Sequence, residues 1–244
     1  MIVGDEDGVL DVRVDREDSY AIGAGIKDSP GKITVDMKGK LNIRANGNDV
    51  TGIGGGKNAF NTPIRLLGGE INLVLTGNSC TCVGIADGGS IVDVENCTVN
   101  IDINAPDGVG IGSFHGNTDI ALKKCNIHQS LNGIAITGIG SNENGTGKLE
   151  LCGATVTGKY MGRTVNCIGT RNGNTECLVR QADITLYSEG STVMGIGDMI
   201  GAGDVTMEQV HLDIEFRAGS PMAYGTKTGI ATYRDVKEDL RVNL

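Results

Sequence analysis

A Gly-Ile-Gly triplet, or a close variant of it, recurs along the whole chain and constrains the fold more than any other feature. The central residues of the triplets are Ile22, Ile53, Ile85, Ile111, Ile139, Ile168, Ile196 and Tyr224. Successive centres lie 31, 32, 26, 28, 29, 28 and 28 residues apart. Self-similarity at a nearly fixed period is the sequence signature of a solenoid. A phosphate-binding glycine loop would occur once and would precede a helix, so the triplets indicate a structural repeat.

Alternating apolar and polar residues predict the strands of each repeat. Segments such as "EINLVL", "TVNIDI" and "VHLDIEF" have the two-residue period of a half-buried strand. Their first inward column is predicted to contain Leu10, Leu41, Ile71, Val99, Ile127, Val156, Ile184, Leu212 and Leu240. Two further columns begin at Val12 and Val14 and end at Val242 and Leu244. With one strand upstream and the triplet as a third, the sequence predicts three short strands per turn of about 28 residues, in about eight to nine turns.

This pattern resembles the right-handed parallel β-helix of the pectin-lyase-like families and of bacterial surface repeats, including adhesin-like modules. The resemblance covers essentially the whole chain and implies one all-β solenoid domain over residues 1–244. We expect residues 1–9 to form an N-terminal leader or cap and residues 225–244 to form the last turn and a cap, in a chain that can be a fragment of a longer protein. The fold hosts lyases, hydrolases, adhesins and passive spacers, so the resemblance predicts architecture better than activity.

The charge and the hydropathy of the chain argue against two classes of partner. A net charge of -9 repels both a nucleic-acid backbone and an anionic membrane surface. No apolar run approaches the ~20 residues that span a bilayer. We therefore expect neither nucleic-acid binding nor membrane insertion. Glycine is the outlier in composition, with 39 of 244 residues, and we expect it at corners that need a positive φ.

The seven cysteines predict neither a metal nor a cofactor site. Cys97 and Cys125 fall where each turn has a small residue, in the column Gly39, Gly69, Cys97, Cys125, Ala154, Ala182 and Val210. Parallel stacking points neighbouring Cβ bonds the same way, which opposes a disulfide, so we expect free thiols. No His or second Cys pair has zinc-ligand spacing. Free thiols favour the cytoplasm and the resemblance favours a secreted or cell-surface location, so the localisation stays open.

The candidate ligand-binding residues lie in loops of variable length along one edge of the coil. The spacing from long strand to triplet is 12 residues, apart from 14 between Ile71 and Ile85, whereas the spacing from triplet to the next strand varies from 7 to 11. Such a variable edge is the usual binding face of a repeat protein. Its candidates are Phe60, Phe114, His115, Asn117, Asp119, Asn142, Asn144, Arg171, Asn172 and Asn174. The alternative is that Asn, Asp and Gly are present because turns use them.

Three residues are weak candidates for catalysis. His128 belongs to an outward column that contains Asp11, Asn42, Asn72, Asn100, His128, Thr157, Thr185 and Asp213, and the asparagines predict a hydrogen-bonded ladder. Asp102 lies diagonally from His128, which would allow an acid/base pair, although a solvated histidine beside an unrelated carboxylate is the simpler interpretation. Asp93 is separate from both. The acidic residues are dispersed, unlike the clusters of polysaccharide lyases with the resembling fold.

These observations predict a non-catalytic, adhesin-like binding or spacer module that presents its variable edge to a glycan or a protein. The alternatives are a polysaccharide lyase or hydrolase, and a ligand-sensing or assembly domain of a regulatory protein. The predicted coil has no polar cap, and open terminal turns expose backbone groups and apolar side chains. We expect the "GDEDG" and "YRDVKED" segments to fold partly over the ends, and the remaining exposure to favour a homo-oligomer or flanking domains.

Overall fold

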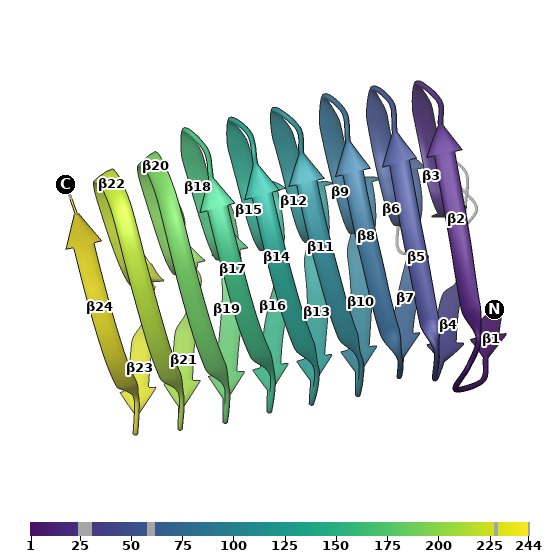
Figure 1. Ribbon diagram of the computed structural model, residues 1–244. Coiled ribbons are helices and arrows are strands. Elements are labelled where there is room, and N and C mark those ends of the chain that lie inside the picture. Colours follow the sequence, from purple (N-terminus) through teal and green to yellow (C-terminus); the bar gives the residue numbers. More distant parts are fainter. Residues whose placement is uncertain (24–30, 58–61, 227–228, 244) are drawn as a thin grey trace.

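The computed structural model describes residues 1–23, 31–57, 62–226 and 229–243 (Figure 1). Every regular element in this part of the chain is a β-strand, and the strands form a solenoid of about eight turns. In Figure 1 the front strands run upward and the rear strands run downward while the chain advances from right to left, so the coil is right-handed. The predicted all-β solenoid, with its period near 28 residues, is confirmed.

Each turn contributes a first, a middle and a third strand. The first strands are β1 (Ile2–Gly4), β4 (Ile33–Met37), β7 (Thr62–Leu67), β10 (Ser90–Glu95), β13 (Thr118–Lys123), β16 (Gly145–Cys152), β19 (Gly173–Arg180), β21 (Val205–Glu208) and β23 (Ala231–Arg234). The middle strands are β2 (Val9–Asp15), β5 (Lys40–Asn46), β8 (Glu70–Thr76), β11 (Thr98–Asn104), β14 (Asn126–Asn132), β17 (Thr155–Met161) and β24 (Lys237–Asn243). The third strands are β3 (Asp18–Gly23), β6 (Asp49–Lys57), β9 (Ser79–Asp87), β12 (Asp107–His115), β15 (Ala135–Glu143) and β18 (Thr164–Thr170). Two long strands, β20 (Asp183–Asp198) and β22 (His211–Thr226), run through both the middle and the third positions of their turns.

Parallel, in-register pairing joins each turn to the next. Leu41 pairs with Ile71 and Ile71 with Val99, and all three side chains are fully buried, as the inward column predicts. Adjacent strands lie ~4.8 Å apart, so the backbone hydrogen bonds run along the axis of the coil. The apolar columns therefore merge into one core that extends from turn to turn.

The triplet column differs from its prediction in one turn. Ile53 pairs with Val83, and Val83 pairs with Ile111, whereas Ile85 pairs with Ser113. The repeat in this turn is thus Cys-Val-Gly, with Val83 in place of isoleucine. Its spacing from Ile71 is 12 residues, so the apparent exception of 14 disappears.

The last turn is a second correction. Leu212 pairs with Glu238 instead of Leu240, and Leu240 pairs with Ile214. The two-residue corner between first and middle strands begins with a residue at positive φ, here Asp235 (φ 51°), as in earlier turns. This corner fixes the register of the strand that follows. The sequence alignment places Leu240 beside Leu212 because both are hydrophobic, and this is two residues away from the observed register.

Both segments predicted to fold over the ends belong to the terminal turns. "GDEDG" contains the corner between β1 and β2, and β1 pairs with β4. "YRDVKED" lies in β23, in β24 and in the corner between them. Leu244, predicted to end the third column, lies outside the described residues.

A column of glycines places a bend in the third-position strands of successive turns. The glycine that ends the triplet has a φ between 122° and 156° in seven turns, at Gly54, Gly84, Gly112, Gly140, Gly169, Gly197 and Gly225. At Gly140 an added Cβ would lie 1.8 Å from the carbonyl oxygen of Gly169. Both the left-handed backbone and this close contact require glycine. The recurring triplet is therefore the sequence of a bend.

The cysteines are free thiols, as predicted, and they fill small spaces in the core. Six of the seven are buried and Cys152 is half-buried. Burial raises the pKa of the Cys97 thiol to about 11 and that of the Cys125 thiol to about 12. These thiols therefore remain protonated at neutral pH, which makes them poor nucleophiles.

We expect the buried thiols to react slowly with a thiol reagent in the folded protein at about pH 8 and to react fully, all seven, after denaturation without reductant. Above about pH 9 the unfolded chain releases thiol protons that the folded chain keeps, so the free energy of unfolding should fall as the pH rises. Thiol titration and urea unfolding over this pH range measure both effects. A thiol count below seven in the denatured chain would reveal disulfides and contradict the assignment.

Replacing Ile139 by Asp should destabilise the protein by about 3 kcal/mol or more, because the change removes a fully buried aliphatic side chain and buries an unpaired carboxylate. Ile134→Asp is the matched control, since Ile134 is 56% exposed, and it should change stability by about 0.5 kcal/mol or less. Urea unfolding gives both values. Equal midpoints for the two variants would show that the interior column is wrong.

Candidate functional site

The third strands β3, β6, β9 and β12 line one groove, and β9 and β12 contribute residues from both of their ends. In β12 the first residue, Asp107, and the last two, Phe114 and His115, line one hollow of about 340 Å³. Because both ends of this strand line one hollow, the strand is concave toward it, and Gly112, with its φ of 139°, lies between the two ends. We call this hollow the edge groove, and the residues that matter here are Asp18, Tyr20, Asp49, Thr51, Asp87, Asp107, Phe114 and His115.

His115 is held between two carboxylates in the wall of the edge groove. Its Nδ1 lies 2.6 Å from Asp87 Oδ1 and its Nε2 lies 3.2 Å from Glu143 Oε2. Both ring nitrogens therefore face a carboxylate that can accept a hydrogen bond. Arg171 continues the row with an Nη1 3.5 Å from Glu143 Oε1. These side chains are partly exposed, so each pair contributes no more than about 1 kcal/mol and mainly fixes the geometry of the wall.

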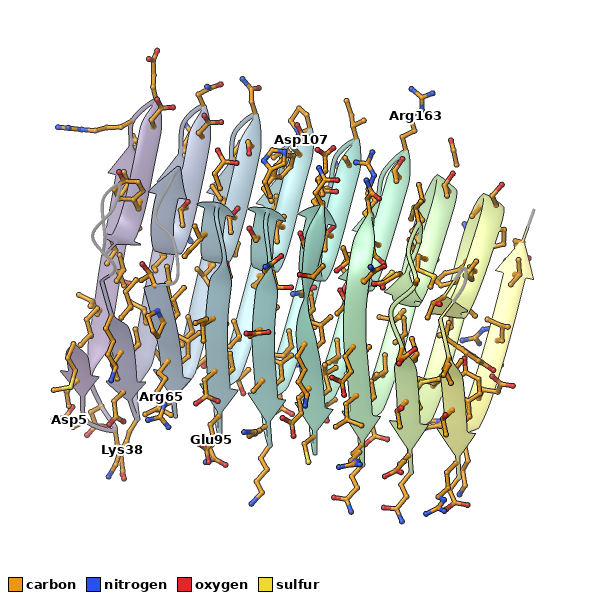
Figure 2. The ribbon with its side chains drawn as sticks, turned by 180° about the vertical axis from the view of Figure 1, so that it is seen from behind. Asp5, Lys38, Arg65, Glu95, Asp107 and Arg163 are labelled. Atoms are coloured by element: carbon orange, nitrogen blue, oxygen red, sulfur yellow. The ribbon has the colours of Figure 1, made fainter. Side chains whose placement is uncertain are left out.

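Asp107 is the carboxyl group of the groove that the fold perturbs most clearly. Burial raises its pKa, the charge of Glu143 raises it further, and Arg171 and His115 oppose the shift. Figure 2 shows Asp107 at one corner of the coil, at the opposite end of the strands from Glu95. A partly desolvated carboxyl in a hollow is well placed to hydrogen-bond a ligand.

Two aromatic rings flank these carboxylates. Phe114 contacts His115 edge-on with ring centroids 4.6 Å apart, and Tyr20 of β3 is 49% exposed. Rings offer apolar faces and carboxylates accept hydrogen bonds, which is the mixture that fixes a polar organic ligand in a pocket. The edge groove therefore has the chemistry of a binding site.

The structure separates the predicted ligand-binding residues into groups. Phe114 and His115 line the edge groove. Asn142 is buried and Arg171 contacts Glu143, both on the turns that follow. Phe60 lies outside the described residues.

The remaining predicted residues form hydrogen bonds along the axis of the coil instead of lining the edge groove. They are Asn117, Asp119, Asn144, Asn172 and Asn174. Asn172 Nδ2 donates to Asn144 Oδ1 at 3.0 Å. Asn117 Oδ1 accepts from the Thr146 amide at 3.0 Å, and Asp119 and Asn174 accept from backbone amides of the next turn in the same way. These bonds favour a structural role for this group, as the turn interpretation predicts.

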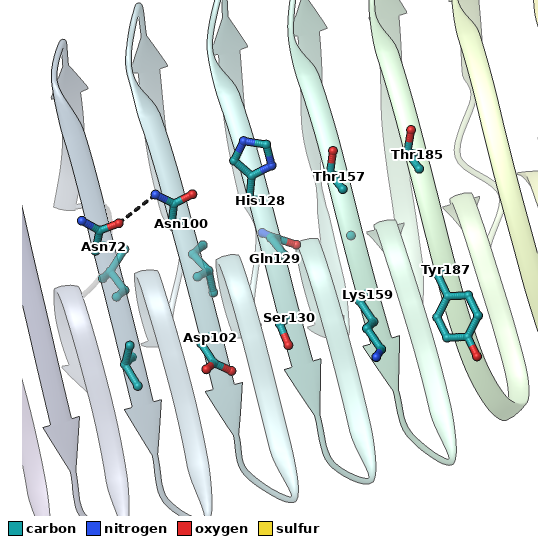
Figure 3. Close-up of a pocket in the computed structure, with 14 residues that line it drawn as sticks. Asn72, Asn100, Asp102, His128, Gln129, Ser130, Thr157, Lys159, Thr185 and Tyr187 are labelled. Carbon is teal, nitrogen blue, oxygen red and sulfur yellow. Dashed lines mark hydrogen bonds between the residues drawn. The ribbon is translucent and has the colours of Figure 1, made fainter.

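A second, more open hollow of about 430 Å³ lies on the outer face of the middle strands (Figure 3). It contains part of the predicted asparagine ladder, in which Asn100 Nδ2 donates to Asn72 Oδ1 at 2.7 Å and Asn72 Nδ2 donates to Asn42 Oδ1 at 2.8 Å. His128 and Asp102 both line this hollow. Figure 3 shows the two side chains apart, and among the described residues no hydrogen bond or ion pair joins them.

Asp93, the third weak catalytic candidate, lies elsewhere. It belongs to the first strand β10, where its Oδ2 accepts a hydrogen bond from Arg65 Nε at 3.1 Å. The geometry therefore brings together no acid/base set from the three candidates. In the described part of the chain, no group of three or more His, Cys, Asp or Glu side chains could hold a metal ion.

Sequence reasoning missed several residues of the edge groove, although the repeat contained the signal. Asp18, Asp49 and Asp107 each stand four residues before a triplet centre, so the bend brings them to the same wall. Asp87 and Tyr20 had no such signal, because their position depends on the bend itself.

Comparisons with protein-family models, with curated proteins and with solved structures find no match for this chain. The pectin-lyase-like and adhesin-like resemblance therefore stays a prediction. The described residues contain no helix of the length and apolarity that would cross a membrane.

Replacing Asn72 by Ala should lower stability by about 1–2 kcal/mol, because Asn72 both donates and accepts in the ladder and its loss removes the bonds made by Asn42 Oδ1 and Asn100 Nδ2. Thr157→Ala is the control in the same outward column, since no side-chain hydrogen bond of Thr157 is described. Thermal and urea unfolding compare the variants. Equal losses would mean that the ladder adds nothing beyond the outer surface itself.

Proposed function

We propose that this chain is a non-catalytic, adhesin-like binding module that takes a neutral or amine-bearing glycan in the edge groove. The observation that supports this most is the meeting of carboxylates, hydroxyls and two aromatic rings in one hollow of about 340 Å³. This volume is within the range of sites that bind small organic molecules. Two of the residues predicted to bind ligand, Phe114 and His115, lie in its wall.

The charge of the groove selects against acidic polysaccharides. Asp18, Asp87 and Asp107 line it, and among its described lining residues there is neither Lys nor Arg. A chain of uronic acids would be repelled by this wall. Sugar hydroxyls, in contrast, can donate hydrogen bonds to carboxylates, and a protonated amine gains a charge-assisted bond.

The surroundings of His115 and His128 favour binding over hydrolysis. His115 has a carboxylate at each ring nitrogen, so it offers no free acceptor for a proton from substrate. On the outer face of the middle strands, His128 lines the more open hollow without a carboxylate partner among the described residues. Neither histidine is therefore placed as a general base.

Rigid construction supports the same proposal. The wall of the edge groove is fixed by in-register pairing of β12 with β9 and β15, and by the row from Asp87 through His115 to Glu143. A groove that is already ordered loses little conformational entropy when a ligand binds. A spacer would not need such a groove.

A glycan array followed by titration calorimetry tests the proposal. We expect neutral or amine-bearing oligosaccharides to bind, and expect Phe114→Ala and Asp107→Asn each to weaken binding about tenfold, through lost packing and a lost charged acceptor. His128→Ala is the control, because His128 lies in the other hollow, and it should leave the affinity unchanged. Circular dichroism confirms that each variant is folded.

Three outcomes would contradict the proposal. Absence of binding to any glycan class would remove the assigned ligand. Loss of binding in the His128 variant alone would move the site to the outer face of the middle strands. Release of unsaturated uronides from a pectic polymer, abolished by changing Asp93, Asp102 or His128, would establish the lyase alternative.

A further inference from the structure

Both ends of the coil present unpaired strands. At one end β1, β2 and β3 pair only toward the interior of the coil, and at the other end β23 and β24 pair only with β21 and β22. Figure 1 shows β2 and β24 at opposite ends of the molecule. Among the described residues nothing covers the outer edges of these strands. Each end therefore offers a row of backbone donors and acceptors that can pair with another strand.

The two ends also carry matching apolar positions. Leu240 and Val242 of β24 are 45% and 43% exposed, although their columns are buried in the turns before them. Val12 and Val14 of β2 occupy the same two columns at the other end, where they are only partly buried against the core. If β2 of one copy paired with β24 of another, Val12 would cover Leu240 and Val14 would cover Val242.

The corner at one end is acidic, and the corner at the other end is flanked by basic residues. The corner between β1 and β2 contains Asp5, Glu6 and Asp7. The corner between β23 and β24 contains Asp235 and is flanked by Arg234 and Lys237. The two corners occupy equivalent positions in their turns, so stacking one end on the other brings the acidic corner next to the basic flanks.

An ion pair inside the coil shows how the outward charges would meet. Arg241 of β24 pairs with Asp213 of β22, one turn earlier and two residues back along the strand. Arg13 and Asp239 would have the same relation across a joint between copies, because Arg13 shares the column of Arg241 and Asp239 shares that of Asp213. The joint would therefore repeat a contact that the coil already makes.

We propose that the two ends bind each other, so that the first turn of a second copy stacks head-to-tail on the last turn of this chain. The pairing is parallel and in register, with β2 beside β24 and β1 beside β23. Since the two surfaces differ, the contact does not close on itself and extends into linear chains of copies. The joint uses β1 and β2, whereas the edge groove is lined by β3, β6, β9 and β12, so stacking does not depend on ligand binding.

Three features keep the joint weak. Arg13 and Asp11 of the second copy would lie directly opposite Arg241 and Asp239, and like charges at opposite positions of paired strands repel. Glu238 pairs with Leu212 of β22 and so belongs to the first inward column. In the joint it would lie opposite Leu10 of the second copy, which belongs to the same column. The last third-strand position that is described belongs to β22, so only first and middle strands meet directly across the joint. We therefore expect association that depends on concentration, and Glu238→Leu should strengthen it at least about fivefold by completing the apolar column.

Sedimentation velocity over a range of concentrations measures the association of the whole chain. Leu240→Lys blocks one end and Val12→Lys blocks the other, and each should weaken self-association at least tenfold, a factor that corresponds to ~1.4 kcal/mol. An equimolar mixture of the two variants should form a dimer, because each variant keeps the end that the other lacks. Ile134→Lys, on an exposed position in the middle of the coil, is the matched control and should behave like the unchanged protein.

The mixture separates head-to-tail stacking from the other possibilities. Monomers at every concentration for the unchanged protein and for Glu238→Leu would overturn the proposal. Association lost in the Leu240 variant but kept in the Val12 variant would mean contact between two C-terminal ends, which also contradicts it. Val14→Lys and Val242→Lys repeat the test if circular dichroism shows that either first variant is unfolded.

Discussion

The close contact between backbones at successive bends is the constraint on which the rest of the structure depends. At Gly140 the space beside the Gly169 carbonyl is too small even for a methyl group, and the positive φ of Gly140 independently disfavours any residue other than glycine. A bend of this kind stacks only on an identical bend, so every turn must carry its glycine at the same place. The inward columns, the axial ladders and the concave edge groove all follow from that alignment.

Much of this fold could be predicted because one geometric requirement repeats. The inward column from Leu41 through Ile71 and Val99 was visible in the alternation of apolar residues. The two errors arose where hydrophobic similarity was preferred to backbone geometry. Val83 replaces Ile85 because the bend requires Gly84, and Glu238 replaces Leu240 because a two-residue corner sets the register. Neither feature is encoded in the hydropathy of the chain.

The candidate site was less predictable, since it combines residues that lie on both sides of a bend. Phe114 and His115 could be proposed from a polar loop, but Asp107 belongs to the opposite end of the same strand. Alternation along a strand says which side a residue faces, and it does not say that the strand is concave toward solvent. The asparagines of the variable edge illustrate the converse. Asn144 and Asn172 look like ligand contacts in the sequence, yet Asn172 donates a hydrogen bond to Asn144 along the axis of the coil.

The asparagine ladder and the backbone pairing share one direction, that of the coil axis, and this has a mechanical consequence. A force that pulls the two ends apart loads these bonds lengthwise, turn against turn, with no covalent crosslink among the described cysteines to carry it. Each turn contacts only its neighbours, so failure would begin at a terminal turn and proceed by peeling. Pressure along the same axis meets a column of close-packed side chains instead. The coil should therefore resist compression along its axis and unfold one turn at a time under tension.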